Sequence, residues 1–216
     1  GAVDSLLDIT NQVWLNGELL GQRPNGWIPF QYEMTPHLNF DGENTLAVKV
    51  DHQHHADARW YTGSGINRNV YLVAKNPVHI DLWGVNFMTP QVSRESARAE
   101  VAVKLNNTTG EQERVQVSVW LNNGDEKRIG ETIKTLTLPA GESMETLLAF
   151  PVEQPQLWSV QHPNLYELQV NVAKDGQTLD DYTQWVGFRR FRFDPNQGFF
   201  LNGKGLTLKG VCIHDD

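Results

Sequence analysis

Apolar and polar residues alternate over most of this chain, and this period of two constrains its fold more than any other feature. A β-strand shows that period when one face packs on a core and the other faces water. No long segment has the period of an amphipathic helix. The alternation is clearest in the stretches 78–82, 101–105, 115–121, 136–138, 147–150 and 166–172.

Turn-forming residues separate these stretches at regular intervals. Clusters of Asn, Gly, Asp and Pro mark the breaks, and they lie at 106–110, 122–125, 139–141 and 174–176. About seven strands are therefore expected between residues 77 and 190. That number and spacing predict an immunoglobulin-like β-sandwich.

The first part of the chain is also rich in β-patterns but is shorter. Residues 13–21 read as a hairpin around Asn16-Gly17, and the stretches 44–50 and 69–73 read as further strands. Only about four strands fit before Pro77, whereas a jelly roll needs about eight. We expect half a sandwich whose open face exposes Val13 and Val48, unless a neighbouring domain or a second copy of the chain covers it.

The pattern of apolar and polar residues changes again after Gly187. Residues 199–204 read as a hairpin, and the apolar run 206–213 comes after it. A continuous apolar run is typical of a strand that is buried on both faces, as in a parallel sheet. We therefore expect a buried strand to begin here.

The charge balance argues against a nucleic-acid partner. The chain has 18 Lys and Arg against 26 Asp and Glu, a formal net charge of -8. An acidic chain without a basic block repels phosphate backbones. No apolar stretch approaches the ~20 residues needed to cross a bilayer, and no signal peptide opens the chain, although a start at Gly1 leaves a trimmed leader open. We expect neither nucleic acid nor membrane as a partner.

Three polar constellations are candidates for a site. The segment 51–57 holds three histidines and two aspartates, but adjacent histidines on an extended chain point to opposite sides, so a solvated loop is favoured over a metal site. The segment 59–68 combines Arg59 and Trp60 with two glycines, which suits either a carbohydrate surface or ordinary packing. His214 precedes two aspartates and is either the end of a barrel strand facing an active site or a solvated tail.

Several motifs together resemble glycoside hydrolase family 2, which contains β-galactosidases, β-glucuronidases and β-mannosidases. The segment 59–70 resembles the closing signature of that family's sugar-binding jelly roll, and it is the most specific of the motifs. The residues of these motifs are closest to those of bacterial β-galactosidase-like members. The other matching segments are 13–21, 26–30, 35–38, 158–166, 187–189, 198–204 and 209–215.

The resemblance implies a mainly β chain of three parts. Residues 1–75 are expected to be the C-terminal half of a jelly roll, 76–188 an immunoglobulin-like β-sandwich, and 189–216 the first strand region of a (β/α)8 barrel. It also implies a retaining hydrolase with two catalytic glutamates. Both glutamates lie deep in the barrel of the family, so no catalytic residue is expected in this chain, which should be inactive alone.

The same resemblance implies contacts with the substrate. His214 matches the histidine that lines the sugar subsite at the first barrel strand, and Arg59 and Trp60 stand where the jelly roll approaches the substrate. Arg59 replaces an Asp of some members, and Asn69 replaces an acidic residue. No cofactor and no metal ligand are implied within this chain. A bacterial cytoplasm and a periplasm are equally compatible with the sequence.

A second interpretation is a stand-alone module that binds carbohydrate or protein without catalysis. The reading frame beyond Asp216 separates the two interpretations: alternating βα units and a strand ending in an Asn-Glu pair indicate the hydrolase, whereas an immediate stop indicates the module. For the hydrolase, the partner is a carbohydrate substrate, and a homo-oligomer would also cover the open face of residues 1–75.

Overall fold

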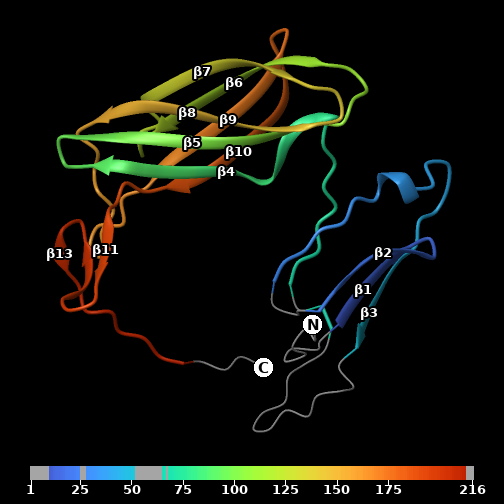
Figure 1. Ribbon diagram of the computed structural model, residues 1–216, viewed down its shortest axis with the longest axis horizontal. Coiled ribbons are helices and arrows are strands. Elements are labelled where there is room, and N and C mark those ends of the chain that lie inside the picture. Colours follow the sequence, from blue (N-terminus) through green and yellow to red (C-terminus); the bar gives the residue numbers. More distant parts are fainter. Residues whose placement is uncertain (1–9, 25–27, 52–64, 67, 213–216) are drawn as a thin grey trace. The chain divides into compact units, whose positions relative to one another are not determined.

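The computed structural model describes residues 10–24, 28–51, 65–66 and 68–212, and their architecture is mainly β (Figure 1). The chain divides into two compact units. The smaller unit comprises residues 1–71 with 211–216, and the larger unit comprises residues 72–210. Among the described residues, no helix is long and apolar enough to span a membrane.

The smaller unit contains an antiparallel sheet in the order β2-β1-β3, formed by β1 (Thr10–Leu15), β2 (Glu18–Arg23) and β3 (Leu46–Asp51). The predicted hairpin is confirmed. Its turn places Asn16 at φ 53° and Gly17 at φ 88°, as a two-residue type I′ turn requires. The single turn of 3-10 helix η1 (Thr35–His37) lies between β2 and β3.

The side chain of Asn16 joins this turn to the segment before β3. Its amide nitrogen donates hydrogen bonds to the carbonyl of His37 at 2.9 Å and to Oδ1 of Asn44 at 2.8 Å. Its own oxygen accepts one from the backbone N–H of Thr45 at 2.9 Å. Asn is therefore suited to this position twice, because it tolerates a positive φ and satisfies three backbone or side-chain groups.

Two expectations for the first part of the chain were wrong in part. Val13 is buried, with 6% of its surface exposed, whereas Val48 is 37% exposed as predicted. Val13 lies on the central strand and is paired with Val48 on the edge strand β3, which explains the difference. The stretch 69–73 forms no strand: it pairs with no other described segment, and Leu72 is 81% exposed.

The larger unit contains the predicted β-sandwich, and its seven strands lie between residues 78 and 186, as the periodicity indicated. One sheet has the order β4-β5-β8 and the other the order β10-β9-β6-β7; Figure 1 shows them stacked face to face. The strands are β4 (Val78–Val92), β5 (Ser96–Asn107), β6 (Glu113–Asn122), β7 (Arg128–Leu138), β8 (Ser143–Glu153), β9 (Tyr166–Lys174) and β10 (Gln177–Val186).

The core of the sandwich is made by the inward positions of both sheets. The buried residues of β5 include Val101, Val103 and Leu105, and the residues between them face outward. The facing strand β6 repeats the pattern over 115–121. Apolar and polar residues thus alternate in the sequence because each of the two sheets buries one face.

Tyr166, the first residue of β9, has the role of a tyrosine corner. Its hydroxyl accepts a hydrogen bond from the backbone N–H of Gln156 at 2.8 Å, and its ring packs edge-on against Phe188. In immunoglobulin-like sandwiches a Tyr near the start of the sixth strand bonds to backbone a few residues upstream, whereas the bond of Tyr166 reaches ten residues upstream. This contact fixes the loop 154–165 against the sandwich.

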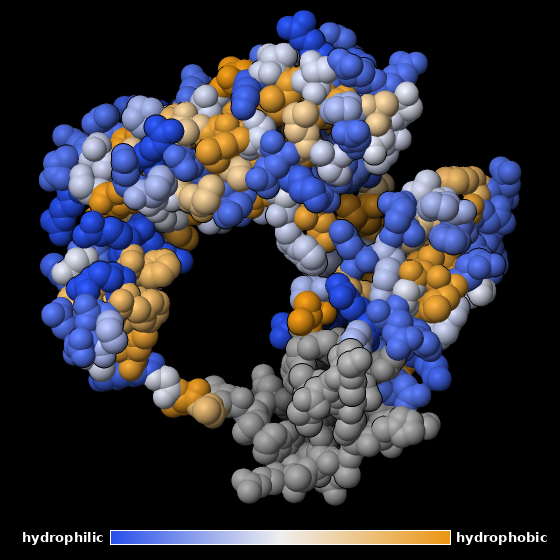
Figure 2. All heavy atoms as spheres, viewed as in Figure 1, coloured by the Kyte–Doolittle hydropathy of each residue, from blue (hydrophilic) through white to orange (hydrophobic). Residues whose placement is uncertain are grey.

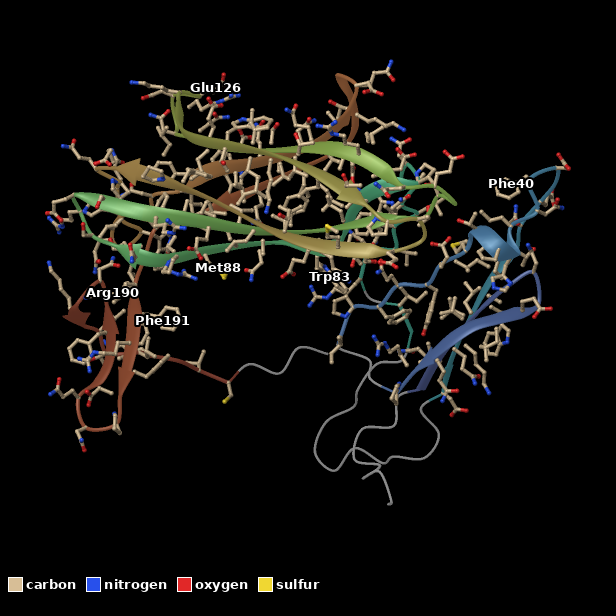
Figure 3. The ribbon with its side chains drawn as sticks, turned by 45° about the horizontal axis from the view of Figure 1, so that its top comes forward. Phe40, Trp83, Met88, Glu126, Arg190 and Phe191 are labelled. Atoms are coloured by element: carbon tan, nitrogen blue, oxygen red, sulfur yellow. The ribbon has the colours of Figure 1, made fainter. Side chains whose placement is uncertain are left out.

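Strand β4 carries a wide bulge at residues 81–84. Between Ile80 and Val85 the strand advances five residues, whereas its partner β5 advances only two, from Leu105 to Val103. Trp83 takes a φ of 54° and is exposed, and it projects from the sandwich in Figure 3. Gly84 is required next to it, because a Cβ there would lie 2.8 Å from the carbonyl oxygen of Asp81.

Asp81 closes this bulge through charge. Its carboxylate pairs with the Lys104 ammonium at 2.6 Å and accepts a hydrogen bond from the Asn106 amide at 3.0 Å. Partial burial by itself would raise the pKa of Asp81, but the hydrogen bonds from Lys104 and Asn106 outweigh it and hold that pKa below its usual range. The same pairing raises the pKa of Lys104.

A small antiparallel meander completes the larger unit. It consists of β11 (Phe191–Asp194), β12 (Gly198–Leu201) and β13 (Lys204–Gly205), so the predicted hairpin at 199–204 is confirmed. The buried strand expected over 206–213 is wrong for the described residues. Residues 206–212 form no strand, and Leu208 and Val211 are exposed, because no described strand lies beside them. The domain bounds 1–75, 76–188 and 189–216 stay predictions.

Candidate functional site

The three residues predicted to contact substrate, Arg59, Trp60 and His214, lie outside the described residues. The histidines of the segment 51–57 lie outside them as well. Among the described residues, no group of three or more His, Cys, Asp or Glu side chains could hold a metal ion. The roles assigned to these residues therefore stay predictions.

The described end of the signature segment 59–70 shows one feature that its sequence indicated. Gly65 has a φ of 127°, which a residue with a side chain rarely adopts. Farther along, the Asn69 amide donates a hydrogen bond to the Tyr71 hydroxyl at 2.9 Å. The glycine at this position is thus needed for the backbone path of the signature.

Asn202 joins the meander to the sandwich within the larger unit. Its side-chain amide donates to the backbone carbonyl of Trp158 at 2.9 Å, and its side-chain oxygen accepts from the backbone N–H of Arg190 at 3.0 Å. Its own N–H donates to the Arg190 carbonyl at 2.7 Å. Asn202 also has a φ of 50°, a conformation that Asn tolerates better than most residues. One side chain therefore connects three segments of backbone.

The segment 187–189 forms the rest of this joint. Phe188 is fully buried, and its ring packs edge-on against Phe87 and Tyr166 with centroid distances of 5.7 and 5.3 Å. Its backbone carbonyl accepts a hydrogen bond from Trp158 N–H at 2.8 Å. The Arg189 guanidinium lies 5.1 Å from the centre of the Trp158 ring, within the range of a cation–π contact. These contacts hold the meander at a defined place on the sandwich.

An open cleft of about 920 Å³ lies at this joint, and its volume falls in the range of ligand sites, about 300–1,000 Å³. Its walls come from the β4–β5 turn at 92–94, the loop 155–164, and the meander at 201–206 together with Arg190. Figure 2 shows strongly hydrophilic residues gathered where the sandwich meets the meander, and Figure 3 labels Arg190 there.

The lining of the cleft is basic and amphipathic. Arg94, Arg190 and Lys204 line it, and none of its described lining residues is Asp or Glu. Apolar side chains such as Leu157 and Leu201 share the walls. A retaining glycosidase needs two carboxyl groups about 5–5.5 Å apart, so the cleft has groups for binding an anion but none for hydrolysing a glycoside.

No pattern in the sequence indicated this cleft. The basic residues lie in three turns, near residues 94, 190 and 204, and each has an ordinary composition. The only signal was indirect: Asn202-Gly203 indicated a turn. It did not indicate that the Asn202 side chain reaches a loop 44 residues away.

Comparison with known proteins finds similarity over most of the chain. A family model described as glycosyl hydrolases family 2 matches residues 78–189, which are more than half of the chain. The β-galactosidase BoGH2A of Bacteroides ovatus is 38% identical over 208 residues, which cover 96% of this chain and 24% of that protein. A putative β-glucuronidase of Formosa agariphila is 32% identical, over 95% of this chain and 19% of that protein.

Solved structures agree with these relatives. A family 2 member from Bacteroides cellulosilyticus matches with a TM-score of 0.90 and 31% identity over 97% of this chain and 29% of that one. The β-glucuronidase of Bacteroides uniformis matches with a TM-score of 0.85 and 32% identity over 96% of this chain and 27% of that one. The chain thus spans about a quarter of the length of the proteins it matches.

Proposed function

Since this chain belongs to glycosyl hydrolase family 2, we propose that it forms the accessory β-domains of a longer retaining glycosidase that hydrolyses terminal β-glycosides. The observation that carries the proposal is the coverage: 96% of the chain aligns with 24% of a β-galactosidase. About three quarters of that relative's length thus lies outside the matching segment. The chain supplies the sandwich and its joint with the meander, and we expect it to be inactive by itself.

β-Galactosides are the proposed substrate class. The support is the β-galactosidase that shares 38% of its residues with this chain, together with a β-galactosidase large subunit of Latilactobacillus sakei that shares 32% over 94% of it. β-Glucuronidases are also among the relatives. A glucuronide is therefore the substrate against which the galactoside proposal is tested.

Within that enzyme, His214 is proposed to line the sugar subsite, and Arg59 and Trp60 to approach the substrate from the first domain. A Trp ring can stack on the apolar face of a sugar, and an Arg guanidinium can donate hydrogen bonds to its hydroxyls. Residues 189–216 are proposed to lead into the catalytic barrel. The rigid joint at Asn202 supports this proposal, because the barrel entrance would be held in place by the sandwich.

A stand-alone binding module is the second candidate function. One observation favours it: the sandwich has a complete core of its own, with Val101, Val119 and Val170 at 1% exposure or less, so it does not need a catalytic domain to fold. A module of this kind would bind glycans as an isolated chain and have no hydrolytic form at all.

The test is a substrate panel with the protein produced from the complete coding sequence that contains this chain. We expect 4-nitrophenyl β-galactoside to be hydrolysed with a higher kcat/KM than the matching β-glucuronide and β-mannoside. NMR of the first product anomer should show retention of configuration. A glucuronide preference would overturn the substrate class, and an inverted first product would overturn the mechanism.

A further inference from the structure

The basic side chains of the cleft differ from six of the eleven other Lys and Arg residues of the larger unit, all of whose residues are described. Six Lys or Arg residues of this unit form ion pairs with Asp or Glu. Arg94, Arg190 and Lys204 have no ion-pair partner within 4.0 Å among the described residues. Three cationic side chains without such a partner thus line one cleft.

Glu95, beside the cleft, offsets part of the Arg94 charge, but the lining itself adds no negative charge. The chain as a whole is acidic, with a formal net charge of -8, yet the described lining of the cleft contains no carboxylate. The nearest acid along the chain is Glu95, whose pKa is lowered mainly by a hydrogen bond from Ser93 and less by the charge of Arg94. Like charges facing one concave surface concentrate positive potential there, which favours an anionic ligand.

The remaining lining residues suit a ligand that is larger than a single inorganic ion. Gln156 and Gln161 line the cleft, and no described residue bonds to their side-chain amides. These amides can donate to and accept from hydroxyl groups, while Leu157 and Leu201 offer apolar surface to carbon-bound hydrogens. A ligand that matches all three features has an anionic group, several hydroxyls and an apolar face.

We propose that this cleft is a binding site for an acidic carbohydrate, whose uronate carboxylate or sulfate ester is bound by Arg94, Arg190 and Lys204. A guanidinium presents two parallel N–H donors that fit either anion. That the ligand is a sugar rests on the proposed glycosidase function, whereas the preference for an anion rests on the cleft alone. The site would hold an acidic glycan beside the enzyme and involves no chemical step.

The test is calorimetric titration of the 216-residue chain with matched disaccharides. Cellobiouronic acid and cellobiose differ at one C6 group, a carboxylate against a hydroxymethyl, and cellobiose 6′-sulfate adds the sulfate source. We expect both acidic ligands to bind at least about tenfold more tightly than cellobiose. Binding should weaken when the ionic strength rises from about 0.01 to 0.15 M, as for any exposed charge contact.

Variants locate the binding. Arg94→Gln with Lys204→Gln should weaken the acidic ligands about tenfold; Arg190 is left intact because its backbone belongs to the joint. The matched control is Arg114→Gln with Lys127→Gln, which removes the same charge from exposed positions of β6 and the β6–β7 turn and should change affinity less than about twofold.

Three results would overturn the proposal: no binding of either acid up to about 10 mM, equal affinity for cellobiose, or equal weakening by the control pair. Near-ultraviolet circular dichroism of each variant verifies its fold. Hydrolysis by the full-length protein is measured separately, so a cleft that binds nothing would leave the glycosidase proposal standing.

Discussion

Replacing Asn202 should detach the meander from the sandwich without unfolding the sandwich. The side chain of Asn202 makes two hydrogen bonds, to the Trp158 carbonyl and from the Arg190 N–H. Each contributes about 0.5–1.5 kcal/mol, so their loss in Asn202→Gly should cost about 1–3 kcal/mol. Asn202→Ala loses the same bonds and also forces a Cβ-bearing residue to a φ of 50°, which adds about 1 kcal/mol.

The assay is native-state hydrogen exchange measured by mass spectrometry. Peptides covering 189–206 should lose protection equivalent to about 1–3 kcal/mol in Asn202→Gly and about 2–4 kcal/mol in Asn202→Ala. Peptides covering 99–105 and 115–121, in the core of the sandwich, should keep theirs. Lower protection in Asn202→Ala than in Asn202→Gly would reveal the cost of the positive φ, because loss of the two hydrogen bonds alone would make the two variants equal.

Asn202→Asp provides the matched control. Its carboxylate can still accept from the Arg190 N–H, but it places an oxygen where the amide donates to the Trp158 carbonyl. The protection of peptides covering 189–206 should therefore be lower in Asn202→Asp than in the wild type at neutral pH. Asn202 does not hold the meander on the sandwich if Asn202→Gly exchanges like wild type over 189–206, or if the core peptides lose as much protection as the meander.

Two further predictions concern the bulge in β4. Gly84→Ala should lower the free energy of unfolding, measured in urea, by about 1–3 kcal/mol, because its Cβ would lie 2.8 and 2.9 Å from the carbonyl oxygens of Asp81 and Lys104. The control Gly124→Ala, whose Cβ would meet nothing within 4 Å, should leave this free energy unchanged. Equal effects of the two substitutions would contradict a steric cause. The depressed pKa of Asp81 means that its ionised form contributes stability above its unfolded pKa of about 3.9, which is lost as pH falls through the lower folded pKa. Asp81→Asn should therefore flatten the loss of stability in acid below about pH 4, and an unchanged acid limb of the stability profile would exclude this role.

The sandwich was predictable from sequence because each of its sheets buries one face. Val101, Val103 and Leu105 alternate with outward residues, and that alternation is a local property of the strand. Whether a strand has a neighbour is not local. The segments 69–73 and 206–212 have apolar composition but no described strand beside them, and composition alone could not show this.

The described candidate site depends on contacts between distant segments. Arg94, Arg190 and Lys204 reach one cleft only because the Asn202 side chain and the buried Phe188 ring hold the meander against the sandwich. No spacing in the sequence relates these positions. Arg59, Trp60 and His214 were found instead by resemblance to a family, and their contacts lie outside the described residues.

We propose that this chain is a non-catalytic part of a longer family 2 glycosidase. The most direct test is hydrolysis of 4-nitrophenyl β-galactoside by the purified 216-residue chain, compared at equal molarity with the protein from the complete coding sequence. Nitrophenol should be released only by the longer protein, with the isolated chain no faster than buffer. Turnover by the isolated chain, or no turnover of any β-glycoside by the longer protein, would contradict it.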